Sequence, residues 1–556
     1  MAARQARKRP VAASAAKNVV MLIGGRWHPF ELCGRIAKEF LESTGRYKLT
    51  VTNANDVLAE GLGKYDGLII YAQGQDITPA QEAGLLKFVR GGGGLVGIHC
   101  AADVFRNSRD YVKLIGSEFK THPPMHQFRV DLVDEAHQAT TRLGGFETFE
   151  EMYHLQNVNE DVQLLATTRW LGQPLPMMYT RTEGKGRVFY TALGHAEKQF
   201  LHPQFKKSLL HGLDWACKVK PAAGPIRCAM LGYGPAFGMG KQHSMQINAT
   251  PGMKAVAACD IDPACTEQAK KDFPYFKTFS SVEAMLKDKT IDLVVIILPH
   301  NLHAPMAIQC LQAGKHVVLE KPFCLTVKEA DAMIAAARRA GKMLTVYHNR
   351  RWDGDHMTIK RIIREGTIGE VFEINAGFAG YRSPGTTWRS DKAISGGNLY
   401  DWGAHFVDWV LALVPQKIQS VSGFFQKKVW MHVTNEDHTQ AIVRFANGAM
   451  ADIVISSLSA ARRPRWRILG TKGAILDDGT VEKGCKVITY RDGSLVTSEV
   501  SWQSRTYQEF YWNVADHLLC GDELAVKGGQ ARRVIGVIEY AGRSSQSGKE
   551  EMFPGG

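Results

Sequence analysis

The sequence lacks any apolar run close to the roughly 20 residues that a membrane-spanning helix needs, and it carries no recognisable DNA- or RNA-binding motif. Ten cysteines are present, but none forms a Cys-x-x-Cys pair, so neither a zinc ribbon nor a disulfide framework is predicted. Cysteines scattered through apolar segments are typical of reduced thiols in the cytoplasm. We therefore expect a cytoplasmic protein that binds neither membranes nor nucleic acid.

Acidic residues are missing from the first 17 positions, although five basic residues lie there: Arg4, Arg7, Lys8, Arg9 and Lys17. The segment also lacks the apolar core of a secretory signal. We interpret it as a disordered leader, with a transit peptide as the alternative. Over the whole chain, 45% hydrophobic and 22% charged residues are ordinary for a soluble globular protein. The 556 residues predict about three or four domains.

A glycine-rich turn near the middle of the chain follows the apolar segment 225–231, which is typical of a buried strand. Helical sequence begins at about Lys241, and a second strand, Lys254–Cys259, leads into an aspartate. Strand, glycine turn, helix, strand and acidic residue are the order of a dinucleotide-binding unit. The glycines let the backbone approach a pyrophosphate, and the helix N-terminus favours its negative charge. The candidate cofactor-binding residues here are Gly232, Gly234, Phe237, Gly238 and Asp260.

The acidic residue after the second strand indicates which dinucleotide is bound. A carboxylate at this place accepts a hydrogen bond from the ribose 2′-hydroxyl and repels the 2′-phosphate of NADP. No arginine follows Asp260 within Ile261, Asp262 and Pro263. We expect NAD as the cofactor and NADP as the less favoured one, although Asp260 lies 26 residues after Gly234 and the glycine spacing is stretched.

Two further segments carry groups suited to proton transfer. Residues 317–322 are an apolar strand that ends in Glu320, Lys321 and Pro322, which places Lys321 at the carboxyl end of a sheet. Asp401 and His405 are four residues apart and would share one face of a helix. A lysine, an aspartate and a histidine beside a nucleotide site suit the oxidation of an alcohol by a nicotinamide.

From residue 225 to about 545, these segments resemble the Gfo/Idh/MocA family of sugar and polyol oxidoreductases. The markers are the glycine turn with Asp260, Pro299 to His303, Glu320-Lys321-Pro322, Asn349-Arg350-Arg351, Ile368-Gly369-Glu370, and Gly396-Gly397 followed by Asp401 and His405. The resemblance implies that Lys321 and His405 act at the substrate carbinol, with Asp401 in support. It also implies cofactor contacts from Pro299, His300, His303, Glu320 and Lys321.

The same resemblance implies a small carbohydrate substrate and a homo-oligomer. Trp388, in a polar loop before the glycine pair, can stack on a sugar ring, and Asn349 or Arg350 can reach substrate oxygens beside Asp401 and His405. After about Glu370, alternating segments separated by short turns predict a large, mostly antiparallel sheet. The family commonly dimerises through the open face of this sheet, so we expect a dimer or a tetramer.

Strands and helices also alternate in the first half of the chain, which predicts a second doubly wound parallel sheet. The segments Gly97-Ile98-His99-Cys100, Glu150-Glu151-Met152-Tyr153 and Gly184 to His195 make this half resemble the ThuA (trehalose utilisation) family, which is similar in fold to class I glutamine amidotransferases. Those enzymes place a nucleophilic cysteine at a strand–helix elbow. Here His99 occupies the elbow and Cys100 lies one residue beyond it, so we do not expect cysteine hydrolase activity.

Histidines follow several strands of this half, at what should be one edge of its sheet. We predict that His99, Glu151 and His195 line one pocket, with two further histidines at its rim. Such groups can hold zinc or a similar divalent metal, with His28, His99 and His195 as candidate ligands, or act as general acid and base. The alternative is that they only hydrogen-bond the backbone. The candidate pocket residues are His28, His99, His122, Glu151, Tyr153 and His195.

The predicted fold class is α/β: a flavodoxin-like, class I amidotransferase-like doubly wound domain, then a Rossmann domain and an α/β domain with a large, mostly antiparallel sheet. The predicted segments are a leader at 1–17, a ThuA-like domain at 18–217, a linker at 218–224, an NAD-binding domain at 225–345, a substrate and oligomerisation domain at 346–545, and a tail at 546–556. The predicted activity is NAD-dependent oxidation of a secondary hydroxyl of a sugar, polyol or glycoside. One alternative is bifunctional, redox-assisted glycoside cleavage through a 3-keto intermediate, with a second lyase or hydrolase activity. The other is a non-catalytic sugar and NAD sensor.

Overall fold

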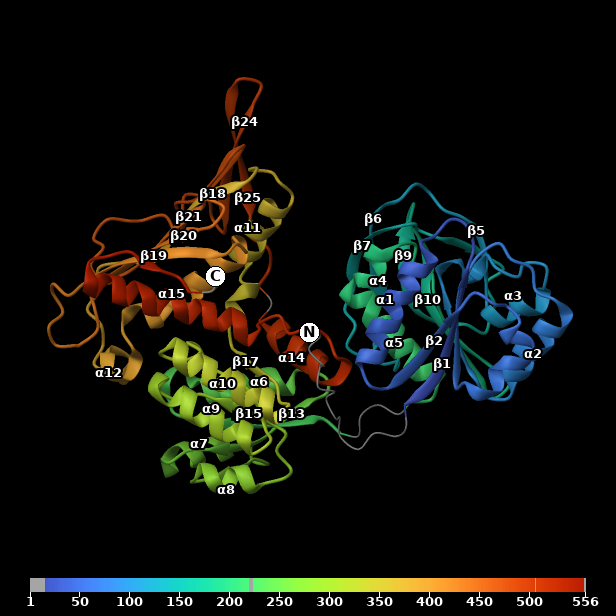
Figure 1. Cartoon of the computed structure of the whole chain (residues 1–556), viewed down its shortest axis with the longest axis horizontal. Helices are drawn as coiled ribbons and strands as arrows, with labels where there is room; N and C mark the ends of the chain where they lie inside the picture. The colour runs from blue at the N-terminus through green and yellow to red at the C-terminus, as the bar shows by residue number, and fades with distance from the viewer. Residues whose placement is uncertain (1–15, 220–223, 506, 555–556) are drawn as a thin grey trace. The chain divides into compact units, whose positions relative to one another are not determined.

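The computed structural model describes residues 16–219, 224–505 and 507–554, which form two compact units (Figure 1). The first unit runs to Gly224 and includes Asp516–Asp522, and the second contains Pro225–Ala515 and Glu523 onward. The predicted leader lies outside the described residues except at its end, where Lys17 already opens the first strand. Residues 220–223 of the predicted linker also lie outside them.

The first unit is built on a nine-stranded sheet whose parallel half has the order β2-β1-β3-β4-β11. Helices α1, α4 and α5 lie on one face of this half and α2 and α3 on the other (Figure 1). Strands β3 and β4 are therefore buried along their whole length, as central parallel strands are. The bounds are β1 Lys17–Gly24, α1 Phe30–Ser43, β2 Tyr47–Thr52, β3 Gly67–Ala72, α2 Pro79–Arg90, β4 Gly94–Ile98, α3 Arg109–Ile115, β11 Gly186–Thr191, α4 Glu197–Leu201 and α5 Pro203–Ala216.

The other half of this sheet is antiparallel, an extension that the sequence analysis did not anticipate. Strands β10, β9, β6 and β7 extend the sheet beyond β11 in that order. No helix separates β9 from β10. A two-residue turn, Leu171 and Gly172, joins them with φ of 48° and 81°, which matches the twist of a hairpin. The bounds are β5 Glu118–Thr121, β6 His126–Leu132, β7 Phe146–Glu150, β8 His154–Gln156, β9 Gln163–Trp170 and β10 Gln173–Glu183.

A short segment from late in the chain completes the first unit. The prediction assigned Asp516–Asp522 to the C-terminal domain, but these residues belong to the first unit. The carboxylate of Asp516 is 5% exposed and pairs with both Arg142 and Lys207. Two cations around one buried carboxylate are a tertiary arrangement that no local sequence pattern indicates.

The second unit begins with a six-stranded parallel sheet of order β14-β13-β12-β15-β16-β17. The order reverses beside β12, the strand that precedes the glycine turn, so a ligand-binding crevice is expected there. The strands are β12 Ile226–Leu231, β13 Met253–Cys259, β14 Lys277–Phe279, β15 Leu293–Ile296, β16 His316–Leu319 and β17 Leu344–Val346. The helices are α6 Met239–Asn248, α7 Pro263–Asp272, α8 Val282–Lys287, α9 His303–Gln312 and α10 Val327–Ala340.

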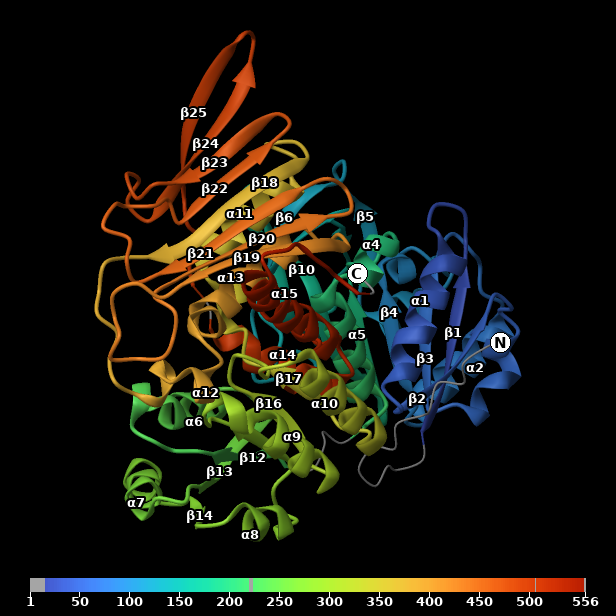
Figure 2. The same ribbon diagram turned by 60° about the vertical axis from the view of Figure 1, so that its left-hand side comes forward.

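A second, nine-stranded sheet follows, in the order β25-β24-β23-β22-β18-β21-β20-β19-β26 (Figure 2). Only β18 and β21 pair in parallel, which agrees with the predicted mostly antiparallel sheet. One face packs on α13 and α15, where Trp409 and Trp466 are completely buried. The bounds are β18 Val371–Ala379, β19 Ile418–Gln426, β20 His438–Phe445, β21 Met450–Ser456, β22 Trp466–Gly470, β23 Gly473–Asp477, β24 Gly484–Arg491, β25 Ser494–Ser501, β26 Glu551–Met552, α11 Gly354–Arg364, α12 Lys392–Ser395, α13 Trp402–Leu413, α14 Gln508–Cys520 and α15 Gly528–Ser547.

The predicted tail, 546–556, is partly built into this sheet, which corrects the sequence-based boundary. Glu551 and Met552 form β26 against β19, and the ring of Phe553 is only 9% exposed. Burial of this aromatic ring favours the docking of residues 551–553 beside β19. All ten cysteines are buried and free. In the described parts of the chain, no helix combines the length and apolarity that crossing a membrane requires.

Candidate functional site

The glycine turn after β12 presents open backbone at the start of a helix. Gly232 has φ of 94°, and a Cβ there would lie 2.1 Å from the carbonyl oxygen of Ile297. Gly234 has no atom within 4 Å of where its Cβ would stand, and Gly238 caps α6 with φ of 59°. This turn thus fits the pyrophosphate of a dinucleotide, which a helix N-terminus attracts.

Asp260 follows β13 directly and faces the glycine turn. One of its carboxylate oxygens accepts from the backbone N–H of Tyr233 at 2.7 Å, and the other from the N–H of Asp262 at 3.0 Å. A carboxylate has about four lone-pair sites. Asp260 therefore braces the turn and keeps capacity for a ribose hydroxyl.

Lys321 and Asp401 meet in a direct ion pair between Nζ and Oδ1. Lys321 follows β16, whereas Asp401 lies just outside α13 with φ of −81° and ψ of −92°. The prediction that Asp401 and His405 share a helix face was therefore wrong for Asp401, which ends the turn before the helix. Burial acts to raise the pKa of Asp401, but the charge of Lys321 outweighs it and lowers the pKa to about 2.

His405 lies one turn into α13 and is 5% exposed. Burial first, and then the charge of Lys321, hold the pKa of His405 well below its ordinary value. The imidazole is consequently neutral and able to accept a proton. His348, which the sequence analysis did not single out, lies with its ring centroid 6.1 Å from that of His405. Both ring nitrogens of His348 are buried without a hydrogen bond among the described residues.

The histidines after β15 are held by backbone carbonyls. His303 directs Nδ1 to the oxygen of Pro322 at 2.7 Å and Nε2 to that of Leu298 at 2.9 Å, so neither nitrogen is free for a cofactor atom. His300 directs Nδ1 to Ser395 at 2.8 Å, while its Nε2 is buried without a partner among the described residues. Burial, and then the neighbouring His303, lower the pKa of His300 to about 3.

Pro299 and Glu320 follow the neighbouring strands β15 and β16 at the same edge of the sheet. The Glu320 carboxylate pairs with Nε2 of His243 at 2.9 Å and accepts from the backbone N–H of Lys321 at 2.9 Å. His243 is completely buried and contacts the Tyr511 hydroxyl at 2.7 Å. Pro299 begins the turn that carries His300. Glu320 therefore orients the backbone of Lys321.

The predicted substrate residues lie on two segments around Asp401. Arg350 pairs with Asp353 at 2.9 Å and covers the ring of Trp402 at 4.6 Å, while Asn349 begins the short helix that contains Arg350. Trp388 contacts His300 edge-on, with ring centroids 4.9 Å apart.

Arg389 is a site residue that the sequence analysis missed. Its Nη1 lies 4.0 Å from the Asp401 carboxylate, and its guanidinium covers the rings of Trp388 and Phe237 at 4.6 and 5.1 Å. Phe237 is 72% exposed. The polar loop around Trp388 was the available signal, but only the fold brings Arg389 to Asp401.

In the first unit, the structure brings His28, His99 and His195 together. Each follows a parallel strand, β1, β4 or β11, and carboxyl ends of such strands share one edge of the sheet. One ring nitrogen of each histidine lies within 4.8 Å of a ring nitrogen of each of the other two. His28 thus lies at the centre, which corrects the prediction that it lies at the rim. Both of its ring nitrogens are buried without a hydrogen bond among the described residues.

The carboxylate of Glu151 faces this histidine cluster. Its oxygens lie 3.0 Å from His195 Nδ1, 3.3 Å from His99 Nε2 and 3.6 Å from His122 Nε2. Burial acts to raise the pKa of Glu151, but His195 and His99 hold it well below its usual value. The ring of Tyr153 stacks on His99 at 3.7 Å.

Glu150 and Cys100 are two buried neighbours of this cluster. Glu150, which the sequence analysis did not single out, is 1% exposed and accepts from the backbone N–H of His195 at 3.0 Å; burial raises its pKa. His99 occupies the strand–helix elbow with φ of 47°. Cys100 is completely buried, and burial raises the pKa of its thiol well above the ordinary value. A thiol in that state is a poor nucleophile.

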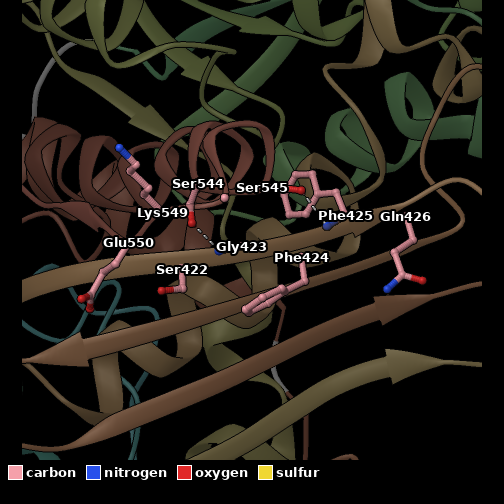
Figure 3. A pocket seen from close by; sticks show the side chains of 10 residues that line it. Ser422, Gly423, Phe424, Phe425, Gln426, Ser544, Ser545, Lys549 and Glu550 are labelled. Atoms are coloured by element: carbon pink, nitrogen blue, oxygen red, sulfur yellow. Dashed lines mark hydrogen bonds between the residues drawn. The ribbon is translucent and has the colours of Figure 1, made fainter.

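A hollow of about 260 Å³ lies apart from both groups of predicted residues, between β19 and the end of α15 (Figure 3). None of the predicted site residues lines it. Its lining comprises Ser422, Gly423, Phe424, Phe425, Gln426, Ser544, Ser545, Gly548, Lys549 and Glu550.

The fold and the glycine turn define a dinucleotide-binding domain that is followed by a large, mostly antiparallel sheet and preceded by a separate α/β domain. The family model for the oxidoreductase family, NAD-binding Rossmann fold, matches residues 226–348, and that for the GFO/IDH/MocA C-terminal domain matches 356–476. The ThuA model, trehalose utilisation, matches 18–216. The chain belongs to the Gfo/Idh/MocA oxidoreductase family and carries a ThuA domain at its N-terminal side.

Known relatives cover the oxidoreductase part. The scyllo-inositol 2-dehydrogenase (NADP(+)) IolW of Bacillus subtilis is 29% identical, over 52% of this chain and 86% of its own length. The scyllo-inositol 2-dehydrogenase (NAD(+)) of the same organism is 28% identical, over 51% of this chain and 83% of its own. The solved structure of the Bacillus subtilis oxidoreductase YvaA is similar with a TM-score of 0.54 and 26% identity, over 60% of this chain and 99% of that one.

Proposed function

We propose that the second unit oxidises a secondary hydroxyl of a sugar, polyol or glycoside and passes the hydride to NAD. The observation that carries this proposal is the Lys321–Asp401 ion pair beside a buried, neutral His405. Lys321 would donate to the carbinol oxygen, and His405 would take its proton. Asp401 holds the ammonium of Lys321 in place. Relatives named as inositol dehydrogenases support a polyol or sugar as the substrate.

NAD fits the residues that the chain offers. The glycine turn gives a pyrophosphate close access to the backbone, and Asp260 offers acceptor sites to a ribose hydroxyl. When bound, the nicotinamide supplies the hydride acceptor. Because the relatives include users of NAD and of NADP, the preference for NAD rests on the charge of Asp260, which would repel a 2′-phosphate.

The test of this function is direct. The purified protein is incubated with NAD and, separately, with NADP and a panel of polyols, sugars and glycosides, and reduced nicotinamide is followed by absorbance. Turnover with at least one polyol or sugar is expected, and Lys321→Ala should abolish it. Tight binding of NAD and a sugar without turnover by the wild type would instead favour the sensor.

We further propose that the first unit binds a divalent metal through His28, His99 and His195, with Glu151 as a fourth ligand. His99 Nδ1 lies 2.7 Å from the carbonyl oxygen of Ala192 and must donate to it. In the neutral ring, Nε2 then carries a lone pair that faces a carboxylate oxygen of Glu151 at 3.3 Å. Two acceptors at that distance need a proton or a cation between them.

A zinc-like ion suits this set because zinc takes imidazole and carboxylate ligands, with Zn–N distances of about 2.0–2.1 Å. Elemental analysis of protein purified without added metal provides the test. Close to one equivalent is expected in the wild type, with none in a His28→Ala/His99→Ala variant. If the wild type is purified without metal and does not bind added zinc, the metal site is contradicted. A proton would then lie between His99 Nε2 and the Glu151 carboxylate.

The presence of both sites in one chain favours a shared substrate. Oxidation of C3 of a glycoside to a ketone makes the C2 proton acidic. Removal of that proton by a base of the first unit outside the metal ligands, together with breakage of the C1–oxygen bond, would release the aglycone. A product assay distinguishes the steps: His99→Ala should leave NAD reduction intact and stop aglycone release.

We also propose a homo-oligomer formed through the face of the large sheet that α13 and α15 leave uncovered. Phe424 and Met450 on this face are 50% and 38% exposed, and the neighbouring strands β22 and β18 carry the ion pair Arg467–Glu373 at 2.6 Å. Light scattering is expected to give a dimer or tetramer, and Phe424→Glu should shift it toward monomer. A cytoplasmic location is proposed on the buried, free cysteines.

A further inference from the structure

We propose that Glu436 and Asn435 are positioning residues for the Lys321–Asp401 pair; this inference rests on the proposed dehydrogenase function. They lie between β19 and β20, in the segment Thr434–Asp437, which we term the brace. The brace is distant in sequence from both partners. Its side chains nevertheless contact the segments 389–392 and 395–398, which lie shortly before Asp401.

Asp401 needs an outside support because its own helix does not hold it. It precedes α13 as the N-cap residue, yet its side chain makes no capping hydrogen bond. The carboxylate points to Lys321 instead. Its direction therefore depends on the preceding turn, Gly396–Tyr400, where Gly396 and Gly397 have φ of 86° and 121°.

Glu436 contacts that turn through its carboxylate. Its Oε2 accepts from the backbone N–H of Asn398 at 3.1 Å, and a Cβ on Gly397 would stand only 2.7 Å from the same oxygen. Its Oε1 pairs with Lys392 Nζ at 2.5 Å, and the side chain is 8% exposed. One carboxylate thus fixes the glycine pair and the short helix α12 before it.

Asn435 ties the brace to the other two groups that face Asp401. Its Nδ2 donates to the carbonyl oxygen of Arg389 at 2.7 Å, and its Oδ1 accepts from the Ser395 hydroxyl at 3.1 Å. The carbonyl oxygen of Ser395 in turn faces Nδ1 of His300 at 2.8 Å. Asn435 thus holds the backbone of Arg389 directly and reaches the ring of His300 through Ser395.

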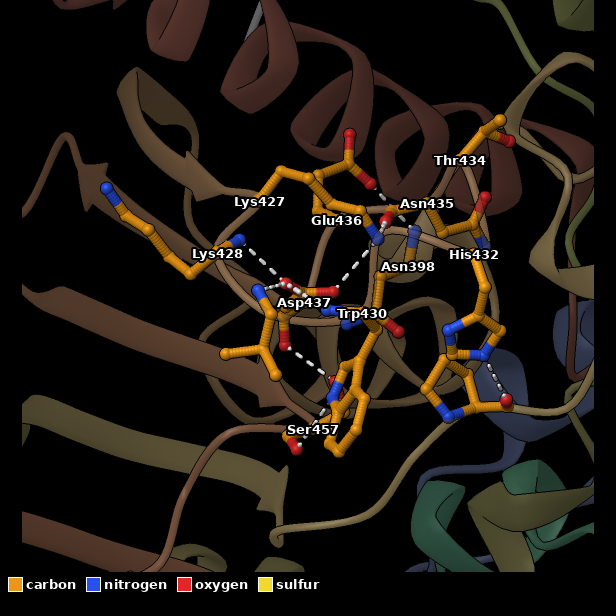
Figure 4. A network of polar contacts seen from close by, with 12 residues as sticks. Asn398, Lys427, Lys428, Trp430, His432, Thr434, Asn435, Glu436, Asp437 and Ser457 are labelled. Carbon is orange, nitrogen blue, oxygen red and sulfur yellow. Dashed lines mark hydrogen bonds and ion pairs between the residues drawn. The ribbon is translucent and has the colours of Figure 1, made fainter.

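Asp437 anchors the brace itself (Figure 4). This residue is 1% exposed, and its Oδ2 accepts from the backbone N–H groups of Lys428 and Val429 at 2.7 Å each. Its Oδ1 pairs with Lys427 Nζ at 3.0 Å. Burial acts to raise the pKa of Asp437, but these donors lower it to about 2. The brace is therefore a rigid element, as a positioning device requires.

The experiment compares Glu436→Ala, Glu436→Gln and Asn435→Ala in the full-length protein. Because a displacement of about 1 Å can cost about 100-fold in rate, we expect kcat with NAD and a polyol substrate to fall by about 10- to 100-fold in both alanine variants. The affinity for NAD, measured by titration, should be unchanged. Glu436→Gln keeps an acceptor for Asn398 and should recover part of the loss. Glu482→Ala, an exposed carboxylate in a turn of the same unit, is the matched control.

A double-mutant cycle separates positioning from a general loss of stability. If Glu436 acts through Asp401, then Glu436→Ala should cost far less in an Asp401→Asn background than in the wild type. Additive losses, or alanine variants with wild-type kcat, would overturn the inference. If Glu436→Ala does not fold, the kcat values of Glu436→Gln and Asn435→Ala provide the test of the inference. Lys321→Ala is the reference variant. If it retains turnover, that result contradicts the proposed active site and is distinct from a contradiction of the role of the brace.

Discussion

Each unit places a carboxylate at the carboxyl edge of a parallel sheet, but the two carboxylates are neutralised in different ways. Asp401 in the second unit has a lysine, Lys321, in direct contact. Glu151 in the first unit has only histidines, and among the described residues neither it nor Glu150 pairs with a lysine or arginine. An ionised carboxylate removed from water needs a compensating positive charge. The second unit therefore carries its own cation, whereas the first must take up protons or a metal.

This difference indicates different kinds of chemistry. A Lys–Asp pair next to a neutral histidine keeps its own two charges in place while the histidine accepts one proton. The net charge of a cluster of three histidines and a carboxylate depends on whether protons or a metal ion are bound to it. The predictions below test that contrast, beginning with the largest expected effect.

Replacement of Lys321 by alanine should remove the cation on which the second site depends. A loss in turnover of at least about 10²–10⁴-fold is expected, the range typical of a positioned proton-transfer group. NAD affinity, measured by titration, should stay close to the wild-type value because Lys321 acts on the substrate side. Lys328→Ala, an exposed lysine on α10, serves as control. A fully active Lys321→Ala variant would contradict the proposed site.

Removal of metal should destabilise only the first unit. A ligand present at 100 times its dissociation constant stabilises the folded state by about 2.7 kcal/mol, so a chelator should lower the melting temperature of the first unit. His99→Ala should abolish this response, and His126→Ala, outside the cluster, should keep it. NAD reduction by the second unit should be unaffected. An identical melting curve with and without chelator would mean that protons alone balance Glu151.

The pH dependence of the second unit should reflect a neutral histidine. The neutral form of His405 is the proposed base, and its pKa lies well below the ordinary 6.5. Activity is lost only as pH falls through that lowered pKa, so kcat/KM should remain level as pH decreases to 6.5. A pH profile measured in constant ionic strength provides the check. An acid limb centred at or above 6.5 would exclude His405 as the base.

Asp260 provides a third arrangement, in which backbone N–H groups from Tyr233 and Asp262 support a carboxylate. Asp260→Ser should narrow the preference for NAD over NADP by about tenfold, which corresponds to about 1.4 kcal/mol. Competitive titration of the two nucleotides measures this ratio. Equal binding of NAD and NADP by the wild type would contradict the proposed role of the charge.

The sequence predicted most of the local architecture correctly. The predicted strand Lys254–Cys259 is observed within β13, and the order of strand, glycine turn and helix around Gly232 is present as predicted. These features depend on periodicity and on glycine geometry, which neighbouring residues fix. The antiparallel half of the first sheet and the strand at Glu551 were missed because strand pairing depends on partners distant in sequence.

What the sequence by itself determined is the edge of each sheet at which groups that follow parallel strands lie, such as His99, His195 and Lys321, because the carboxyl ends of parallel strands meet at one edge. Only the tertiary structure decided which groups touch. It moved His28 from the rim to the centre of its cluster, brought Arg389 to Asp401, and set Glu436 under the glycine pair before it. Each of these contacts joins loops that are far apart in the sequence, and such a separation does not show how close two loops lie in space. The packing of the helices and strands that carry the loops fixes these distances.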